Sequence, residues 1–280
     1  MRVIVLVSTI DDGIRGVARL LPSEQDGVTH VVSWQRTTDD GTCDAAATLL
    51  RQRSDVTLSV VQGRGLCRNR NNAIAVGLSL LSHPLEDAIF VIADDDERLV
   101  PEAVTRLRAL YAKYPKLDGA LLRVRSIDDG SYFKSYPAGL VAYARRPRSY
   151  YPCSVEMTFR TRVWQSGLRF DERFGLGSAV LCAGEEEVLL HDMTRCGLNI
   201  LVVPEDLCET VAKTTGSHTL DVKMLRSKGA VYAYEMNGMA ALARGVREAI
   251  SLGVRHRRNP WHIFRNILFG VKYIREWRQS

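Results

Sequence analysis

The sequence predicts an α/β protein whose mostly parallel central sheet is flanked by helices and followed by a basic helical appendage. Strand-like and helix-like segments alternate through residues 1–116, which is the order that produces parallel strands joined by helical crossovers. The first segment, residues 2–8, is a continuous apolar run of the kind that is buried on both faces of a sheet. Residues 221–280 have a helical pattern and many basic residues, so we expect the appendage there.

Each element is predicted from its apolar periodicity and its boundary residues. Strands are expected at residues 2–8, 29–33, 56–61 and 88–93, alternating with helices at 14–21, 43–53, 69–81 and 101–114. The last of these helices has Pro101 at its first position. Further strands are expected at residues 121–126, 155–160 and 201–204, with a helix at 185–196 and a loop at 131–152. We therefore place one domain over residues 1–220, with halves at 1–116 and 117–220.

The composition excludes several classes of protein. Hydrophobic residues make up 46% and charged residues 25%, as in an ordinary globular protein. We expect neither a membrane span, which needs ~20 apolar residues, nor a signal peptide, because the N-terminal apolar run is too short. Six cysteines without a CxxC pair argue against a zinc site or disulfide scaffold and for the reducing cytoplasm. The net charge of +6 belongs to residues 240–280, which carry +7, so no nucleic-acid partner is expected.

Three consecutive aspartates, Asp94, Asp95 and Asp96, follow the fourth predicted strand. Adjacent carboxylates repel one another, so such a cluster is costly unless a cation neutralises it. In extended chain Asp94 and Asp96 project to the same side, and two such ligands suit Mg²⁺ or Mn²⁺ together with substrate phosphates. The alternative is a solvated acidic turn that caps the next helix. In parallel sheets ligands bind at the carboxyl ends of the strands, which is where these aspartates lie.

Two further segments carry candidate functional residues. Residues 63–71 have the sequence GRGLCRNRN, in which glycine permits close backbone approach and arginine offers forked donors for phosphate oxygens. This loop matches neither GxGxxG nor GxxxxGK[ST], and its alternative is a basic turn at the start of a surface helix. Residues 184–190 have the sequence GEEEVLL, which supplies either a general base or acids that the helix dipole favours.

The order and spacing of these segments resemble family 2 of the nucleotide-sugar glycosyltransferases, which have the GT-A (Rossmann-like) fold. The resemblance covers residues 3–216 and includes the first strand ending in VST, the GLCRNRN loop and the aspartate triplet. It continues through FDERFGLG at residues 170–177, then GEEEVLL, and finally TTG at residues 214–216. It implies a nucleotide-sugar-binding half, an acceptor-binding half and an inverting transfer from a nucleotide-diphosphate-sugar, with a UDP-sugar most expected, to a hydroxyl of a carbohydrate or lipid-linked acceptor.

The resemblance also implies roles for individual residues. Asp96 and Asp94 would hold a divalent cation, Mn²⁺ or Mg²⁺, that bridges the donor diphosphate. Glu186 would be the catalytic base, with Glu185 as the alternative, although the family usually has aspartate there. His218 is the histidine nearest to the position of the family's histidine metal ligand. The implied donor-binding residues are Ser8, Thr9, Ile10, Gln35 (or Asp39 or Asp40 in its place), Arg64, Arg68, Arg70, Asp94 and Asp95.

The C-terminal segment leaves two interpretations open. An apolar stripe with basic residues on its flanks is formed by Trp261, Phe264, Ile267, Leu268, Val271 and Ile274. Such a helix adsorbs to an anionic membrane surface, or it packs on the protein itself or on a second subunit in a homodimer. Peripheral attachment to the inner face of the cell membrane would suit a lipid-linked acceptor in bacterial surface polysaccharide or glycolipid synthesis. The alternative functions are a nucleotidyltransferase and a non-catalytic membrane-bound adaptor with a degenerate transferase fold.

Overall fold

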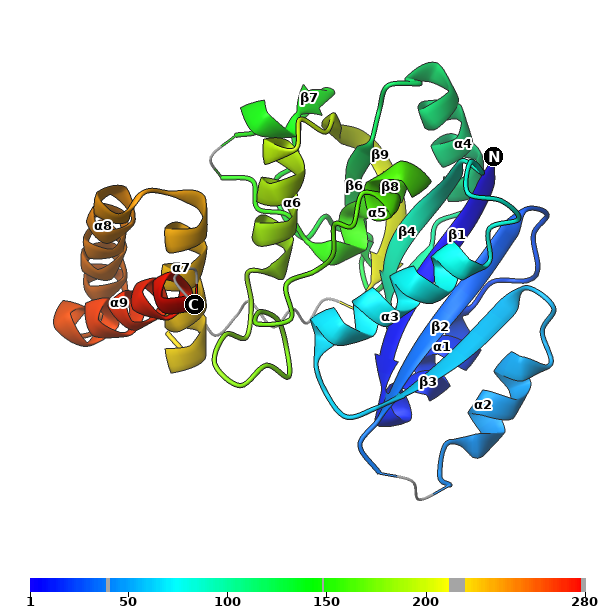
Figure 1. Cartoon of the computed structure of the whole chain (residues 1–280), viewed down its shortest axis with the longest axis horizontal. Helices are drawn as coiled ribbons and strands as arrows, with labels where there is room; N and C mark the ends of the chain where they lie inside the picture. Colours follow the sequence, from blue (N-terminus) through cyan, green and yellow to red (C-terminus); the bar gives the residue numbers. More distant parts are fainter. Residues whose placement is uncertain (39–40, 148, 212–219, 278–280) are drawn as a thin grey trace. The chain divides into compact units, whose positions relative to one another are not determined.

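The protein, represented by a computed structural model, is described over residues 1–38, 41–147, 149–211 and 220–277. Its chain forms two compact units, each with its own hydrophobic core. The first unit comprises residues 1–64, 68–169 and 192–213, and the second comprises residues 65–67, 170–191 and 214–280. The first unit contains the β-sheet, and the second contains the C-terminal helices (Figure 1).

The first unit is built on one β-sheet. The strands are β1 (Arg2–Ile10), β2 (Val28–Arg36), β3 (Val56–Gln62), β4 (Ala88–Asp94), β5 (Glu97–Leu99), β6 (Gly119–Ser126), β7 (Val141–Ala142), β8 (Met157–Arg160) and β9 (Ile200–Thr210). Among the described residues their order is β3-β2-β1-β4-β8-β6-β9-β5, and β7 pairs with β9. Strands β1, β2, β3, β4, β6 and β9 are parallel, whereas β5, β7 and β8 run antiparallel to their neighbours. The predicted mostly parallel sheet is therefore confirmed.

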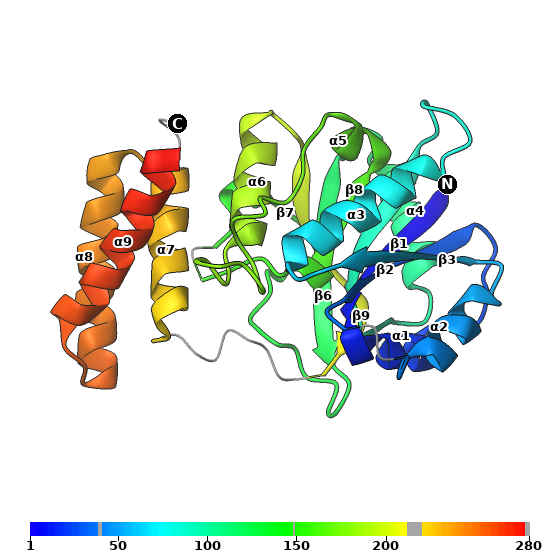
Figure 2. The same cartoon turned by 60° about the horizontal axis from the view of Figure 1, so that its bottom comes forward.

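Helices cover both faces of this sheet because alternate strand residues point to opposite sides. The helices before the C-terminal segment are α1 (Ile14–Leu20), α2 (Asp44–Arg51), α3 (Leu66–Ser79), α4 (Ala103–Lys113), α5 (Thr161–Gln165) and α6 (Glu185–Arg195). Val3 and Val7 of β1 share a core with α1, α2 and α4. Leu6 faces the other side, where its side chain lies 3.0 Å from the Cβ position of Gly77 in α3. Figure 2 shows α3 on one face and α1 and α2 on the other.

The second unit contains α7 (Val222–Glu235), α8 (Gly238–His256) and α9 (Pro260–Trp277). The apolar stripe predicted for the last helix is largely buried: Ile267, Val271 and Ile274 pack in cores shared with α7. Trp261 stays 69% exposed, so packing within the unit accounts for most of the stripe but not for its first residue. None of the helices in the described ranges combines the length and apolarity needed to cross a bilayer.

Several elements differ from their predicted bounds because strand pairing decides them. The strand predicted at residues 201–204 is β9, which extends to Thr210 because it pairs with β6 on one side and with β5 and β7 on the other. The chain after β4 makes a turn at residues 95–96 and returns as β5 before any helix begins. The helix predicted from Pro101 begins at Ala103, and the predicted loop 131–152 includes β7. The predicted boundaries at residues 116 and 220 stay predictions.

Candidate functional site

The aspartate triplet lies at the carboxyl edge of the sheet, where β4 ends at Asp94. Residues 95–96 form the turn into β5, so the three side chains follow a turn and not the extended chain that the sequence analysis assumed. Each carboxylate is held by a different element of the first unit. The contacts are Arg70 Nη2 to Asp94 Oδ1 at 3.1 Å, Thr9 Oγ1 to Asp95 Oδ2 at 2.6 Å, and Thr210 Oγ1 to Asp96 Oδ1 at 3.2 Å. The turn therefore joins the ends of β1, β4 and β9 to α3.

A fourth carboxyl group adds to the negative charge of this turn. Glu97 is 9% exposed, and among the residues that the structure describes neither of its carboxyl oxygens has a hydrogen-bond partner of normal geometry. Burial, followed by repulsion from Asp94, raises the pKa of Glu97 well above its ordinary value. Desolvation, with added repulsion from Asp94, also raises the pKa of Asp95 and of Asp96. The turn gathers carboxyl groups in an environment that opposes their ionisation, which is a condition that a bound cation relieves.

The residues of the turn fit a divalent cation of the Mg²⁺ or Mn²⁺ type only as part of its coordination shell. No three His, Cys, Asp or Glu side chains in the described part of the chain converge as a metal-binding group. Such ions are, however, commonly held by one or two carboxylates, with water and substrate phosphates in the remaining positions. Asp96 is exposed and Asp94 is 31% exposed, so both can be reached from solvent. His218 lies outside the described residues, and its role as a ligand stays a prediction.

Arg70 has a contact that its sequence motif did not indicate. Its side chain is 2% exposed, and Nη2 donates to Asp94 and to Ser154 Oγ at 2.6 Å. Arg70 thus places a buried positive charge next to Asp94. The same guanidinium links Asp94 to η3 (Ser154–Glu156). Arg64 and Arg68 are exposed, as a direct contact with a diphosphate requires. Their predicted donor contacts, and that of Arg70, stay predictions.

The carboxyl ends of β1 and β2 lie beside the aspartate triplet. Ser8, Thr9 and Gln35 are buried, and Ile10 is partly exposed. The side chain of Asn69, in the first turns of α3, donates to the Thr9 carbonyl at 2.9 Å. The Ser8 hydroxyl is buried and forms no hydrogen bond within the described residues, so it can serve a bound ligand at this edge. The predicted roles of these residues in binding a nucleotide base stay predictions.

Gly13 allows the loop after β1 to approach the triplet. A Cβ atom at Gly13 would lie 2.0 Å from Asp95 Oδ2 and 2.6 Å from Thr9 Oγ1. Any side chain there would displace the hydrogen bond that orients Asp95. A role for Asp95 follows from this contact, because its carboxylate accepts the Thr9 hydroxyl and thereby fixes the turn between Asp94 and Asp96.

The predicted catalytic bases lie in the second unit, at the N-terminus of α6. Glu185 is 5% exposed, whereas Glu186 is half-buried and can meet a substrate. Gly184 has φ +98°, a left-handed conformation that favours glycine, and a Cβ there would lie 2.5 Å from Val231 Cγ2. Acidic side chains suit this position, because a helix N-terminus carries partial positive charge. The assignment of Glu186, with Glu185 as alternative, stays a prediction.

A buried polar cluster beside the site was missed by sequence reasoning. Lys134 Nζ lies 2.5 Å from Glu156 Oε1, and their side chains are 5% and 1% exposed. Tyr136 and Tyr150 donate their hydroxyls to the same carboxylate at 2.9 and 2.5 Å. Glu156 belongs to η3, together with the Ser154 that contacts Arg70. The only signal in the sequence was a tyrosine-rich loop, because contacts about twenty residues apart in irregular chain leave no periodicity.

Comparison with known proteins identifies the fold. No protein-family model and no curated protein matches the chain. Among solved structures, the 1–349 fragment of S. aureus TarS, a GT-A-type glycosyltransferase, matches with a TM-score of 0.60 at 13% identity. That match covers 85% of this chain and 66% of the fragment, so the chain spans slightly less than two thirds of it.

The same TarS fragment has been solved with ligands. Its complex with UDP matches with a TM-score of 0.57 at 15% identity, covering 85% of this chain and 66% of the fragment. Its complex with UDP-GlcNAc matches with a TM-score of 0.57 at 14% identity, and this match covers 85% of this chain and 67% of the fragment. At these identities the likeness shows that the chain has a GT-A-like fold, as its sequence resemblance implied.

Proposed function

We propose that this protein is a glycosyltransferase that moves a sugar from a UDP-sugar to a hydroxyl group of a carbohydrate or lipid-linked acceptor. The observation that carries the proposal is the aspartate turn at the carboxyl edge of a GT-A sheet, tied by Thr9, Arg70 and Thr210. Structures of the same fold in S. aureus TarS contain UDP and UDP-GlcNAc, which supports the choice of nucleotide. The surface-polymer or glycolipid pathway, a location on the inner face of the membrane and a homodimer belong to the same proposal.

In this proposal the first unit binds the donor. Ser8, Ile10 and Gln35 line the nucleotide base, and the exposed guanidinium groups of Arg64 and Arg68 contact the diphosphate. Asp94 and Asp96 would hold the divalent cation, which when bound would offset the charge that develops on the departing diphosphate. The buried Arg70 holds Asp94 in place by the contact that its guanidinium makes.

The transfer inverts the anomeric centre. The acceptor hydroxyl oxygen forms a bond to the anomeric carbon from the side opposite the diphosphate, and the bond between that carbon and the phosphate oxygen breaks. The electron pair leaves with UDP, and the hydroxyl proton passes to the carboxylate of Glu186, which acts as general base. Glu186 is the better candidate of the two because Glu185 is buried.

Two variants test the donor site and the base separately. We expect UDP with Mn²⁺ to raise the melting temperature, and Asp96→Asn to weaken this effect. Glu186→Gln should keep the UDP-induced shift but lower UDP release from a screened UDP-sugar by about 10²-fold or more, since general bases contribute that much. Asp26→Asn and Glu276→Gln remove the same charges at exposed positions and serve as matched controls.

The outcomes distinguish the parts of the proposal. Absence of any nucleotide-induced shift in the wild-type protein would refute the donor site. A Glu186→Gln variant with unchanged turnover would refute its role as base, and Glu185→Gln would then be measured as the alternative. A melting-temperature shift with UDP alone that Mn²⁺ does not increase would refute the metal role of Asp94 and Asp96.

A further inference from the structure

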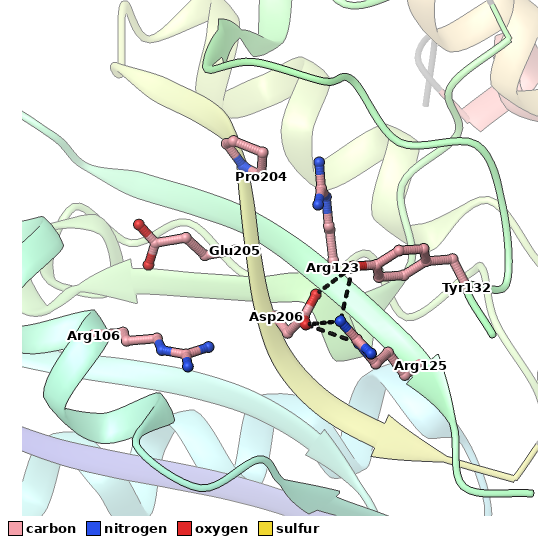
Figure 3. A pocket seen from close by; sticks show the side chains of 7 residues that line it. All are labelled: Arg106, Arg123, Arg125, Tyr132, Pro204, Glu205 and Asp206. Atoms are coloured by element: carbon pink, nitrogen blue, oxygen red, sulfur yellow. Dashed lines mark hydrogen bonds and ion pairs between the residues drawn. The ribbon is translucent and has the colours of Figure 1, made fainter. Parts of the chain in front are cut away.

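A cavity in the first unit lies along β9 and is lined by charged side chains (Figure 3). It has a volume of about 400 Å³, which is enough for a sugar residue carrying an acidic group. Its lining residues are Arg106, Arg123, Arg125, Tyr132, Pro204, Glu205 and Asp206. None of these belongs to the aspartate turn or to the strand ends described above, so the proposed transfer leaves this cavity without a role.

The negative charge of Asp206 is already compensated within the cavity. Arg125 Nη2 lies 2.6 Å from Asp206 Oδ2, and the Tyr132 hydroxyl donates to Asp206 Oδ1 at 3.1 Å. Arg125 also donates to the Tyr132 oxygen at 3.1 Å. Figure 3 shows these three side chains joined by the dashed contacts on one side of β9. Asp206 therefore fixes Arg125 and Tyr132 in place and presents little free negative charge to a ligand. Glu205, the other carboxylate of the lining, projects on the opposite side of β9 from Arg123, where Arg106 lies (Figure 3).

Arg123 is the cation that remains available. No carboxylate in the described part of the chain forms an ion pair with it, and its Nε is buried without a hydrogen-bond partner. Its Nη2 donates to the Pro137 carbonyl at 3.2 Å, and its guanidinium centre lies 5.4 Å from the Tyr132 ring centroid. A guanidinium that is held at one nitrogen and over an aromatic ring, and that forms no ion pair among the described residues, is a preorganised partner for a planar or tetrahedral anion.

Two neighbouring cavities have lining residues in common with this one or with each other, and we refer to the three together as the groove. A cavity of about 340 Å³ shares Arg106, Arg125 and Asp206 with it, and one of about 550 Å³ shares residues 100–102 and Glu209 with the second. Arg106 lies at the junction of the first two, where its ion pair with Glu102 is on the surface. A groove of this extent fits several units of a chain and not a single small molecule.

We propose that this groove binds an anionic glycan chain, with a phosphate or carboxylate group of the glycan on Arg123 and the next unit beside Arg106. The exposed part of the Tyr132 ring, which Arg123 and Arg125 already approach, adds apolar contact area for the sugar. If the protein is the glycosyltransferase proposed above, the chain held here is the acceptor, and the groove selects acceptors that carry acidic groups. Binding in the groove itself needs neither nucleotide nor metal.

The experiment is a calorimetric titration of the full chain without nucleotide or metal, so a failure of the transferase assignment does not affect it. The probes are tetragalacturonate for carboxylate, a glycerol-phosphate oligomer for phosphate, and neutral maltotetraose. We expect one or both acidic probes to bind and maltotetraose to bind at least about tenfold more weakly, because charge-assisted contacts dominate. Arg123→Gln should weaken binding of the acidic probe about tenfold, and Arg123→Lys by less, since lysine keeps the charge but lacks the fork.

Arg51→Gln is the matched control, because Arg51 is exposed on α2 and its removal changes the net charge equally. Arg106→Gln, at the surface of α4, gives a second test if the Arg123 variants fold poorly, and it should weaken binding of the same probe. Equal binding of maltotetraose, equal effects of Arg51→Gln and Arg123→Gln, or no binding of either acidic probe at millimolar concentration would overturn the proposal.

Discussion

Replacement of Lys134 by methionine should strongly destabilise the first unit, because it leaves the Glu156 carboxylate buried without its counter-charge. Lys134 Nζ is 2.5 Å from Glu156 Oε1, and it also lies 4.5 and 4.4 Å from the ring centroids of Tyr150 and Tyr151. Methionine has a similar length, so the change removes charge with little loss of volume. Removing one partner of a buried pair typically costs about 3–5 kcal/mol in the free energy of unfolding. The hydroxyls of Tyr136 and Tyr150 still bind the carboxylate, so we expect the lower end of that range.

The loss of stability in Lys134→Met should depend on pH. Burial raises the pKa of Glu156, and attraction to Lys134 opposes this rise. In Lys134→Met the pKa of Glu156 will therefore rise further. A carboxyl group whose folded pKa exceeds its unfolded value binds its proton more tightly in the folded state, so its contribution to stability is present at low pH and is lost as pH rises through the folded pKa. The destabilisation by Lys134→Met should be larger at pH 8 than at pH 5.5.

Urea unfolding at these two pH values measures the effect, and a double-mutant cycle separates the pair from its surroundings. Lys134→Met/Glu156→Gln removes both charges and should recover most of the lost stability. The same variants can be titrated with UDP, because Glu156 shares η3 with the Ser154 that positions Arg70. Equal destabilisation at both pH values, or a double variant no more stable than Lys134→Met, would show that the buried ion pair is not what holds this loop.

Two further changes test other parts of the fold. Gly270→Ala should destabilise the second unit by roughly 1–3 kcal/mol, because its Cβ would lie 1.9 Å from the backbone oxygen of Arg226 and force α9 away from α7. The control in thermal unfolding is Gly139→Ala, whose Cβ would meet no atom of the described residues within 4 Å. Burial lowers the pKa of His30 despite its contact with Asp55, so the stability that its neutral form contributes is present above pH 6.5 and is lost as pH falls below it. His30→Gln should therefore flatten the fall in urea stability between pH 7 and 5 relative to the wild-type protein, and an unchanged slope would contradict this account.

The parallel core of the fold could be predicted from the sequence, but the elements that complete it could not. The buried parallel strands β1 and β4 contain uninterrupted apolar runs, at residues 3–7 and 88–93, and this pattern is visible without knowledge of their partners. The β5 strand has only three residues and exists because Glu97 to Leu99 pair with the end of β9. A strand that short carries no periodicity of its own. The same holds for β7, which pairs through two residues.

In the candidate site, too, some residues could be found from the sequence and others could not. Each of the three motifs (the aspartates, the arginine loop and the acidic start of α6) is contiguous in sequence, so the sequence alone could single out these residues as candidates. The partners that fix them are distant: Thr9 and Thr210 reach the triplet across 86 and 114 residues. Arg70, which the motif assigned to the donor, is buried and contacts Asp94, a position that depends on how α3 packs against the sheet.

The sequence by itself determined the α/β fold class, the position of the carboxylates at the edge of the sheet and the helical nature of the C-terminal segment. Each of these depends on residues that are neighbours in the chain or on local periodicity. Only the tertiary structure decided that Asp95 is held by Thr9, that the stripe of α9 packs in the second unit, and that Arg123 lines a cavity without forming an ion pair among the described residues. The physical reason is that burial and charge compensation are properties of residues brought together by packing, and the linear order of the chain does not record them.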